Sequence, residues 1–371
     1  MKKNDTLFMP LLSAYYFFYF ALVGVYIIFM PKALADLQYS TFEIGVIYFA
    51  APFMRFLLPF VFKSLVALTP KVYTYSLVLM LLSTLLFSYS ISNFWLHLFS
   101  NLLFGATMGV SLPYVETIAI SKLSKNRYGR ARLWGSIGFI VIALWLGKML
   151  SAPHETFTYL AAMAFFTLIF GILVLKYDDV SHPTAQENAS FSLSKYWAFW
   201  LSIFLMQVSF GGFYNFFTIY ETSRGVSLEM TSWMWSFGVI CEIFMLYFQG
   251  PLLQRNLLNI LQFATIITAV RWLMLYLFPD SIALTFASQS LHAISFALYH
   301  TTAITYVFSL YTQKKLAQQF FLGIAFGLGG SIGALLSGKI YGEHLFLVEA
   351  VIAFIAFVVL WLHQKRKQSI Q

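Results

Sequence analysis

Ionisable side chains occur within long apolar stretches of this sequence. Glu242, Arg271 and His292 lie deep within three such stretches in the second half of the chain. A charge at the centre of a bilayer costs about 2.5–3.5 kcal/mol on insertion scales, so each of these groups needs a partner. Counted from the ends of their stretches at about 1.5 Å per helical residue, the three lie at depths that long side chains can bridge. We therefore predict an Arg271–Glu242–His292 cluster.

Such a cluster could exchange a proton. Desolvation disfavours the charged form of a carboxyl group and a nearby arginine favours it, so moving the arginine would switch protonation. We predict Glu242, Arg271 and His292 as proton-coupling residues, and we add His300 because it lies roughly on the same helical face, eight residues further on. The alternative is that these groups only hold helices together as satisfied buried polar contacts.

A second acid and base flank a basic segment in the first half of the chain. Glu116 precedes this segment, and Arg132 opens the next apolar run. At the inner ends of adjacent spans, they could meet across a short connection and neutralise each other. Arg132 could instead extend to the membrane interface. Arg55, within another apolar run, could line a cavity or bond backbone carbonyls.

Aromatic residues are abundant, with 41 Phe, 22 Tyr and 9 Trp. Most are expected to face lipid or to form interfacial belts. Phe139, one turn from Gly135, and Tyr214 with Asn215 are expected to face a cavity if the charged pairs form as predicted. An aromatic surface with an acid–base pair suits a sugar ring, whereas an aromatic pocket with an unpaired arginine suits an aromatic carboxylate. We therefore count these three residues, with Glu116, Arg132 and Arg55, as candidate substrate-binding residues.

The composition indicates a polytopic membrane protein. Of 371 residues, 60% are hydrophobic and 10% are charged, whereas soluble domains carry about a quarter charged residues. The run from Leu7 to Met30 is long enough to cross a bilayer and stay, and we expect no short, cleavable signal with a small-residue cleavage site before this span. Cys241 is the single cysteine, which excludes an internal disulfide and a multi-cysteine metal site. The basic residues lie in short loops, a pattern that sets membrane topology and does not indicate nucleic acid.

Twelve apolar windows predict twelve transmembrane helices. With the N-terminus inside, most loop lysines and arginines fall on the inner side, and only Lys32, Lys148, Arg224 and Lys339 fall outside. This bias predicts that both termini are cytoplasmic, and we expect an inner-membrane protein. The windows are 8–30, 41–62, 72–91, 94–119, 132–151, 157–175, 196–220, 230–253, 257–278, 282–309, 318–339 and 345–363.

A polar interruption divides the windows into two sets of six. We predict bundles over 1–176 and 196–371, joined by a cytoplasmic linker over 177–195 that is rich in Asp, Asn, Ser and Pro. Gly-Ser-Ile-Gly occurs at 135–138 and again at 330–333, in the fifth span of each half. This favours duplicated halves, a known plan of transporters.

The eleventh span is rich in glycine. Close helix contact or helix sliding is the expected use of such small residues, and tight packing without movement is the alternative. The glycines concerned are Gly323, Gly327, Gly329, Gly330 and Gly333.

Several segments together resemble a known family. The chain is similar over nearly its whole length to major facilitator superfamily proton symporters of the lactose permease type, and most closely to their 3-phenylpropionate transporter branch. The segment YGRARLWGS at 128–136 carries the most specific likeness. The other segments are EIG at 43–45, MRF at 54–56, WSFGVICE at 235–242, VRW at 270–272, and QSLH at 289–292 with His300.

The resemblance implies an all-α integral membrane protein with the major facilitator fold, in which two six-helix halves surround a central cavity. It places Glu116 and Arg132 on the permease's sugar-binding acid and arginine, Arg271 on its coupling arginine, and His292 on its histidine.

This sequence departs from the permease at several positions. Ser295 stands where the permease has its proton-carrying glutamate, Val239 where it has a sugar-contacting glutamate, and Phe139 where it has a sugar-stacking tryptophan. The glycine- and aspartate-containing loop of the superfamily is not evident in Lys63–Lys71. Galactoside transport is therefore disfavoured, and Glu242 becomes the favoured proton carrier.

We therefore expect a secondary transporter, not an enzyme, that takes up a small organic solute with a proton by alternating access. An aromatic carboxylate such as 3-phenylpropionate is the favoured solute. A nucleoside or oligosaccharide proton symporter and proton-driven efflux are the alternatives. A polytopic membrane transferase is a more distant one, because it would need a catalytic constellation near a bilayer face, and a transport-inactive sensor is another. We expect a monomer with no metal, and with no cofactor beyond the proton gradient.

Overall fold

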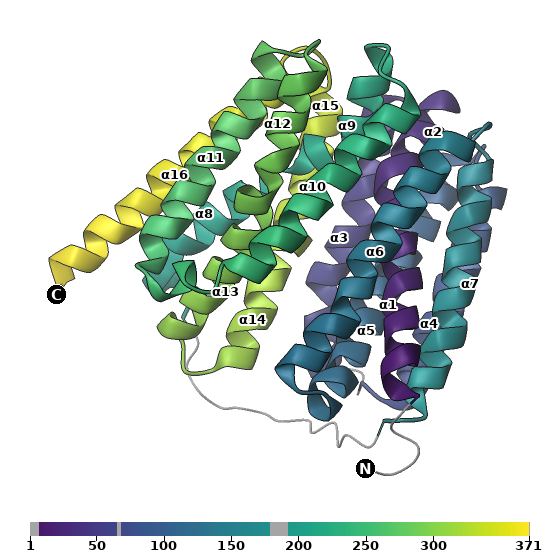
Figure 1. Ribbon diagram of the computed structural model, residues 1–371, viewed down its shortest axis with the longest axis horizontal. Coiled ribbons are helices and arrows are strands. Elements are labelled where there is room, and N and C mark those ends of the chain that lie inside the picture. Colours follow the sequence, from purple (N-terminus) through teal and green to yellow (C-terminus); the bar gives the residue numbers. More distant parts are fainter. Residues whose placement is uncertain (1–6, 65–67, 179–191, 371) are drawn as a thin grey trace. The chain divides into compact units, whose positions relative to one another are not determined.

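The structure is a computed structural model that describes residues 7–64, 68–178 and 192–370. Within these ranges the regular structure is helical and no strand occurs. Twelve helices in the described part are long and apolar enough to cross a membrane (Figure 1). The twelve predicted windows are therefore confirmed, most of them to within a few residues at each end.

The first six spans come from the first part of the chain. Span one is built from three consecutive segments that form one continuous helix, and each of the other five is a single α-helix. The elements are α1 (Phe8–Gly24), η1 (Val25–Phe29), α2 (Met30–Asp36), α3 (Thr41–Ser64), α4 (Pro70–Tyr89), α5 (Phe94–Lys122), α6 (Lys125–Met149) and α7 (Glu155–Leu175).

The last six spans are less regular. Span seven consists of α8 and α9 with a break at residues 209–210, and spans ten and eleven each contain a π-helical segment. The elements are α8 (Trp197–Val208), α9 (Gly211–Ser223), α10 (Leu228–Phe248), α11 (Leu257–Leu277), α12 (Ile282–Ser290), η4 (Ala293–Leu298), α13 (Tyr299–Leu310), α14 (Lys314–Leu322), η5 (Gly323–Gly329), α15 (Gly330–Ile340) and α16 (Leu345–Ile370).

Polar residues in the connections fix where several helices begin. Thr69 accepts a hydrogen bond from the Val72 amide at the start of α4, and Asn93 accepts one from the Leu96 amide at the start of α5. Ser281 caps α12 in the same way. Such caps satisfy amides that have no partner inside the helix.

Three π-helical segments were not predicted by the sequence. They are η1, η4 and η5, and each leaves the apolar pattern of its span uninterrupted. A π segment adds one residue to a turn and often accompanies a functional site. Here η4 begins immediately after His292, and η5 covers most of the glycine-rich part of span eleven.

The predicted connection between Glu116 and Arg132 is almost entirely helical. α5 continues to Lys122 and α6 begins at Lys125, so only Leu123 and Ser124 lie between them. The predicted window began at residue 132 because residues 125–131 are too polar to count as apolar. Both side chains of the predicted pair therefore lie on helices.

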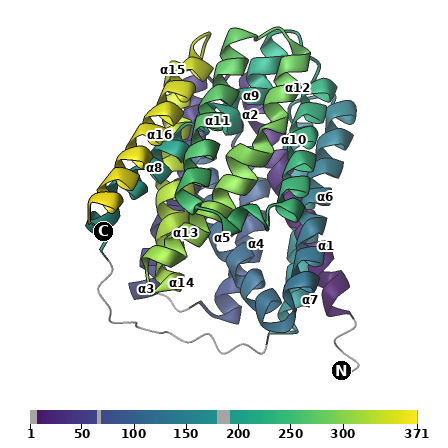
Figure 2. The same ribbon diagram turned by 60° about the vertical axis from the view of Figure 1, so that its left-hand side comes forward.

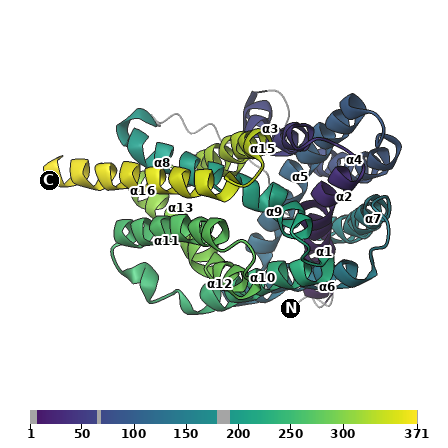
Figure 3. The same ribbon diagram turned by 90° about the horizontal axis from the view of Figure 1, so that it is seen from above.

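The described residues form two compact units. The first comprises the described residues of Met1–Ala185 and of Thr218–Ser236, and the second comprises those of Gln186–Phe217 and of Phe237–Gln371. In the first unit, α1 packs against α6 and α7, and α5 packs against α3 and α4. In the second, α16 packs against α8 and α11, whose ribbons run beside it in Figures 2 and 3. Residues 179–191, most of the predicted linker, lie outside the described residues, so the division at 177–195 stays a prediction.

The repeated Gly-Ser-Ile-Gly segments play the same packing role in the two units. A Cβ atom at Gly138 of α6 would overlap the backbone of Phe17 in α1. A Cβ atom at Gly333 of α15 would lie 2.8 Å from the Val208 carbonyl oxygen in α8. In each unit the last glycine of the repeat thus allows close approach to the first helix of that half, as expected for small residues in membrane helices.

Candidate functional site

The predicted acid–base pair forms in the first unit. Arg132 Nε on α6 donates to Glu116 Oε1 on α5 at 3.3 Å, and the two side chains are 33% and 30% exposed. The Tyr128 hydroxyl donates to the same carboxylate oxygen at 3.4 Å. Because Glu116 accepts from two side chains of α6, it joins these helices beyond their short connection.

The guanidinium of Arg132 also lies on aromatic rings of α1. Its central carbon is 4.0 Å from the centroid of the Phe20 ring and 5.3 Å from that of Tyr16. Gly135 makes room for this arrangement, because a Cβ atom there would lie 2.7 Å from the Phe20 ring and 3.0 Å from Arg132 Nη1. Stacking of this kind holds a cation without neutralising it.

The terminal nitrogens of Arg132 make no hydrogen bond to the residues that the structure describes. Among the described residues, Nε is the nitrogen of Arg132 that makes a hydrogen bond, and Nη1 and Nη2 make none. The side chain is also folded onto α1 and α5. This geometry differs from the alternative in which Arg132 reaches for the membrane interface.

Arg55 on α3 shares one neighbour, Tyr19, with this pair, and we count the three charged residues as one cluster. Its side chain is exposed, and within the described part of the chain it makes no hydrogen bond or ion pair. It interacts electrostatically with Tyr19, which also interacts with Glu116 and Arg132. The predicted alternative, bonding of Arg55 to backbone carbonyls, is not seen among the described residues. The cluster therefore contains two cations and one anion.

The predicted charged cluster in the second unit also forms, with Arg271 of α11 as its most buried member. Arg271 is 0% exposed. Its Nη1 donates to His292 Nδ1 and to Ser295 Oγ, and its Nη2 donates to Gln289 Oε1, each at 3.0 Å. Three neutral acceptors therefore solvate this cation in place of water.

Aromatic rings cover the same guanidinium. The central carbon of Arg271 lies 4.3 Å from the centroid of the Phe213 ring and 4.6 Å from that of Trp272. These contacts stabilise a cation away from water.

His292 connects Arg271 to Glu242. His292 Nε2 lies 3.6 Å from Glu242 Oε2, and the Glu242 side chain is 19% exposed. Arginine can only donate, so Nδ1 of His292 is the acceptor and the ring proton sits on Nε2, facing Glu242. The cluster thus contains all three predicted residues, in the order Arg271, His292, Glu242. Among the described residues, Arg271 and Glu242 share no hydrogen bond.

Gln289 and Ser295 were not predicted as members of this cluster. Ser295 was noted only because it lacks the acid of the permease, yet its hydroxyl accepts from Arg271. The sequence does contain a pattern that indicates them, because Gln289, His292 and Ser295 are spaced by three residues. This spacing places polar groups along one face of a helix.

Of the two residues predicted in span seven, one lies at the charged cluster and the other bonds within its own helix. Tyr214 interacts electrostatically with Glu242 and Arg271, and its ring stacks on that of Phe210 at 5.5 Å. The Asn215 amide donates to the Gly211 carbonyl within its own helix at 2.7 Å. Tyr214 is therefore brought to the charged cluster, whereas the amide of Asn215 is used locally.

Phe139 and His300 lie in aromatic and apolar surroundings. Phe139 is 8% exposed, and its ring lies against Gly24 of α1. The His300 ring packs against Phe296 and Phe326, at centroid distances of 6.0 and 5.3 Å. The functional roles of Phe139, Asn215 and His300 stay predictions.

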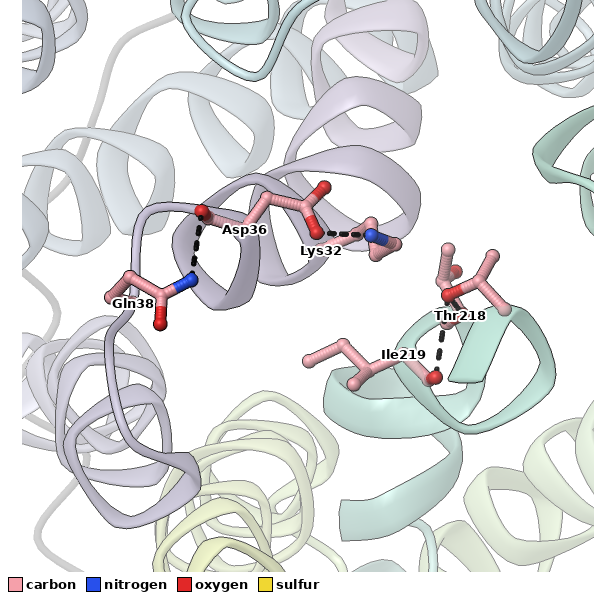
Figure 4. A network of polar contacts seen from close by, with 6 residues as sticks. Lys32, Asp36, Gln38, Thr218 and Ile219 are labelled. Carbon is pink, nitrogen blue, oxygen red and sulfur yellow. Dashed lines mark hydrogen bonds and ion pairs between the residues drawn. The ribbon is translucent and has the colours of Figure 1, made fainter. Parts of the chain in front are cut away.

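A cavity in the first unit is lined by both apolar and polar residues. It has a volume of about 260 Å³, and Lys32, Asp36 and Thr222 are among its lining residues. Lys32 and Asp36 form an ion pair one turn apart on α2 (Figure 4). In the described part of the chain, no group of three His, Cys, Asp or Glu side chains is placed to hold a metal ion.

Twelve membrane-spanning helices with charged clusters inside them define a transporter of the major facilitator superfamily. The chain belongs to the MFS_1 like family, whose model matches residues 10–356. It is therefore a multi-pass membrane transporter and not an enzyme, as the sequence predicted.

Individual relatives agree with this class. A protein described as a probable 3-phenylpropionic acid transporter from Escherichia coli (strain K12) is 25% identical over 365 residues, covering 91% of this chain and 93% of that protein. A sucrose permease of Escherichia coli is 24% identical over 284 residues, covering 67% of this chain and 66% of that protein. The crystal structure of the nucleoside transporter NupG has the same fold, with a TM-score of 0.77 at 18% identity, over 96% of this chain and 99% of that one.

Proposed function

We propose that this transporter takes up a small aromatic carboxylate together with a proton by alternating access. The observation that carries the proposal is the cluster of Arg132, Arg55 and Glu116. It holds one more cation than anion, and the terminal nitrogens of Arg132 make no hydrogen bond to the described residues. One carboxylate of a solute would neutralise this site.

Arginine suits this task because its planar fork binds both oxygens of a carboxylate. Phe20 and Tyr16 beside the guanidinium supply apolar surface for the aromatic part of the solute. The relation to the probable 3-phenylpropionic acid transporter supports the same class of solute. We propose Glu116, Arg132 and Arg55 as substrate-binding residues, and the roles of Phe139, Tyr214 and Asn215 in binding stay predictions.

The proton would bind at the contact between Glu242 and His292. Glu242 is the more exposed of the two, so it can exchange protons with water, and His292 is held by Arg271. Movement of Arg271 would change the electrostatic stabilisation of Glu242 through His292. His300, eight residues further along the span, is the predicted auxiliary residue. No cofactor other than the proton gradient is part of this scheme.

Other solutes and the opposite direction of transport are the alternatives within this class. The acid–base pair and aromatic rings around Arg132 would also suit an oligosaccharide, which agrees with the relation to a sucrose permease, or a nucleoside. Proton-driven efflux would use the same carboxyl group, that of Glu242. The distribution of lysine and arginine supports an inner-membrane protein with both termini in the cytoplasm, and we propose that it acts as a monomer.

Uptake into proteoliposomes tests this proposal. Labelled 3-phenylpropionate is offered beside labelled sucrose and uridine, with and without an imposed inward proton gradient. We expect gradient-dependent accumulation of 3-phenylpropionate and background levels of the other two. If sucrose or uridine accumulates and 3-phenylpropionate does not, the proposed solute is wrong. If uptake is the same with and without the proton gradient, proton coupling is rejected. Loss of solute from preloaded vesicles under the reverse gradient would support efflux.

A further inference from the structure

A buried carboxyl group in span twelve has no role in the scheme above. Glu349 lies on α16 and is 1% exposed. Its Oε1 accepts from the Gly212 backbone amide, and it accepts from the Ser337 hydroxyl at 3.2 Å. Its Oε2 is buried and has no hydrogen-bond partner among the described residues. Oε1 therefore accepts two hydrogen bonds, and Oε2 takes part in none with the described residues.

Among the described residues, one charged group interacts with Glu349. From α11, the Arg271 guanidinium interacts with it electrostatically, and α9 contributes the amides of Gly212 and Phe213. α15 contributes the hydroxyl of Ser337, and α8 contributes no charged group among the described residues. The rings of Trp272 and Phe346 stack at 6.0 Å between α11 and α16, next to Arg271 and one turn from Glu349.

The charges of Arg271, Glu242 and Glu349 in the second unit sum to zero when one of the two carboxyl groups is protonated. Arg271 is a cation, and its three hydrogen bonds go to neutral side chains. Glu242 and Glu349 are the two carboxyl groups that can balance it. If both were ionised, the group would carry an excess negative charge inside the membrane, which is costly. One proton removes the excess.

An ionised carboxylate would cost more free energy at Glu349 than at Glu242. It is 1% exposed, whereas the Glu242 side chain is 19% exposed and lies beside His292. A neutral carboxyl at Glu349 still accepts through Oε1 from Gly212 and Ser337. Its proton can sit on Oε2, the oxygen without a partner.

We propose that Glu349 is a second proton-binding site of this transporter, protonated while Glu242 is ionised and sharing one proton with the Glu242–His292 contact during the cycle. This inference rests on the proposed proton coupling and adds a residue to it. The single positive charge of Arg271 is then balanced by one carboxylate at a time.

The competing role for Glu349 is structural. Its carboxylate bonds the first turn of α9, just after the break in span seven, and would cap that helix as an ion. Glutamine separates the two roles, because its amide oxygen can still accept from Gly212 while its side chain cannot bind or release a proton. Glu343→Gln, at an exposed residue six positions earlier, is the matched control.

Infrared difference spectroscopy of proteoliposomes between mildly acidic and mildly alkaline buffer observes the proton without any solute. We expect a carbonyl band of a protonated, buried carboxyl near neutral pH in the wild type. It should be lost in Glu349→Gln and remain in Glu343→Gln and Glu242→Gln. A band that persists in Glu349→Gln, or absence of such a band in the wild type, would overturn the proposal.

Transport by the same proteins keeps this inference distinct from the proposed function. If the wild type accumulates solute in a proton gradient, Glu349→Gln should retain solute exchange and lose accumulation. Full accumulation by Glu349→Gln would overturn the role of Glu349 while proton coupling stands. If the wild type ignores the gradient, the proposed function fails, and the infrared band still reports whether Glu349 holds a proton. Thermal unfolding of Glu349→Gln within a few degrees of the wild type shows that the α9 contact is kept.

Discussion

Replacing Arg132 with alanine should weaken solute binding far more than it weakens the fold. The proposed carboxylate contact uses two terminal nitrogens that make no hydrogen bond within the described protein. Hydrogen bonds to charged groups contribute about 1.5–3 kcal/mol each, and the lower value applies because the side chain is 33% exposed. Two such bonds total about 3 kcal/mol, which corresponds to roughly a 100-fold increase in Kd.

Isothermal titration of the purified transporter with 3-phenylpropionate measures this change. Arg132→Lys keeps the charge and loses the fork, so we expect roughly a tenfold increase in Kd, equivalent to about 1.4 kcal/mol. Arg130→Ala is the matched control, because Arg130 is exposed on the same helix two residues away. Equal affinity in Arg132→Ala and Arg130→Ala would refute the assignment of Arg132 to the solute site. A solute other than 3-phenylpropionate, if uptake identifies one, takes its place in the titration.

Three further changes test the proton site and the packing around both clusters. Glu242→Gln should abolish accumulation against a gradient and leave solute exchange in vesicles, because exchange requires no proton release; unchanged accumulation would remove Glu242 from coupling. Gly138→Ala should lower the free energy of unfolding by about 1–3 kcal/mol through overpacking, whereas Gly129→Ala, where the added carbon meets no atom of a neighbouring element within 4 Å, should not lower the melting temperature. Gln289→Leu removes an acceptor from buried Arg271, so we expect a loss of about 1–3 kcal/mol in the same denaturation assay; wild-type stability would show that the cation has found another partner.

The spans could be predicted from the sequence because each contains about twenty apolar residues, which is a one-dimensional signal. The π segments could not, because one added residue in a turn does not change that signal. η4 follows His292 within an unbroken apolar run. The start of α6 was also missed, because its first turns are basic and amphipathic and resemble a loop by composition.

The two charged clusters could be predicted because a charge inside a membrane requires a partner, and few charges were available to pair. The order of the contacts within each cluster could not be predicted. The sequence gives no indication that Arg271 bonds His292 Nδ1 and two neutral side chains, because these contacts depend on helix rotation. Glu349 was missed for a related reason. Its partner is the backbone at the break in span seven, and backbone amides carry no residue-type signal.

In the proposed scheme, the charges of the two sites explain why neither solute nor proton moves alone. With His292 neutral and one proton shared by Glu242 and Glu349, the cations Arg55, Arg132 and Arg271 carry three positive charges, and Glu116 with the remaining carboxylate carries two negative ones. A bound monocarboxylate brings this sum to zero. The proton alone leaves an excess positive charge and the solute alone leaves an excess negative one, and a charge inside the membrane costs about 2.5–3.5 kcal/mol even on lenient scales. The doubly loaded state therefore reorients at a lower cost than either singly loaded state, which is the condition for coupled uptake.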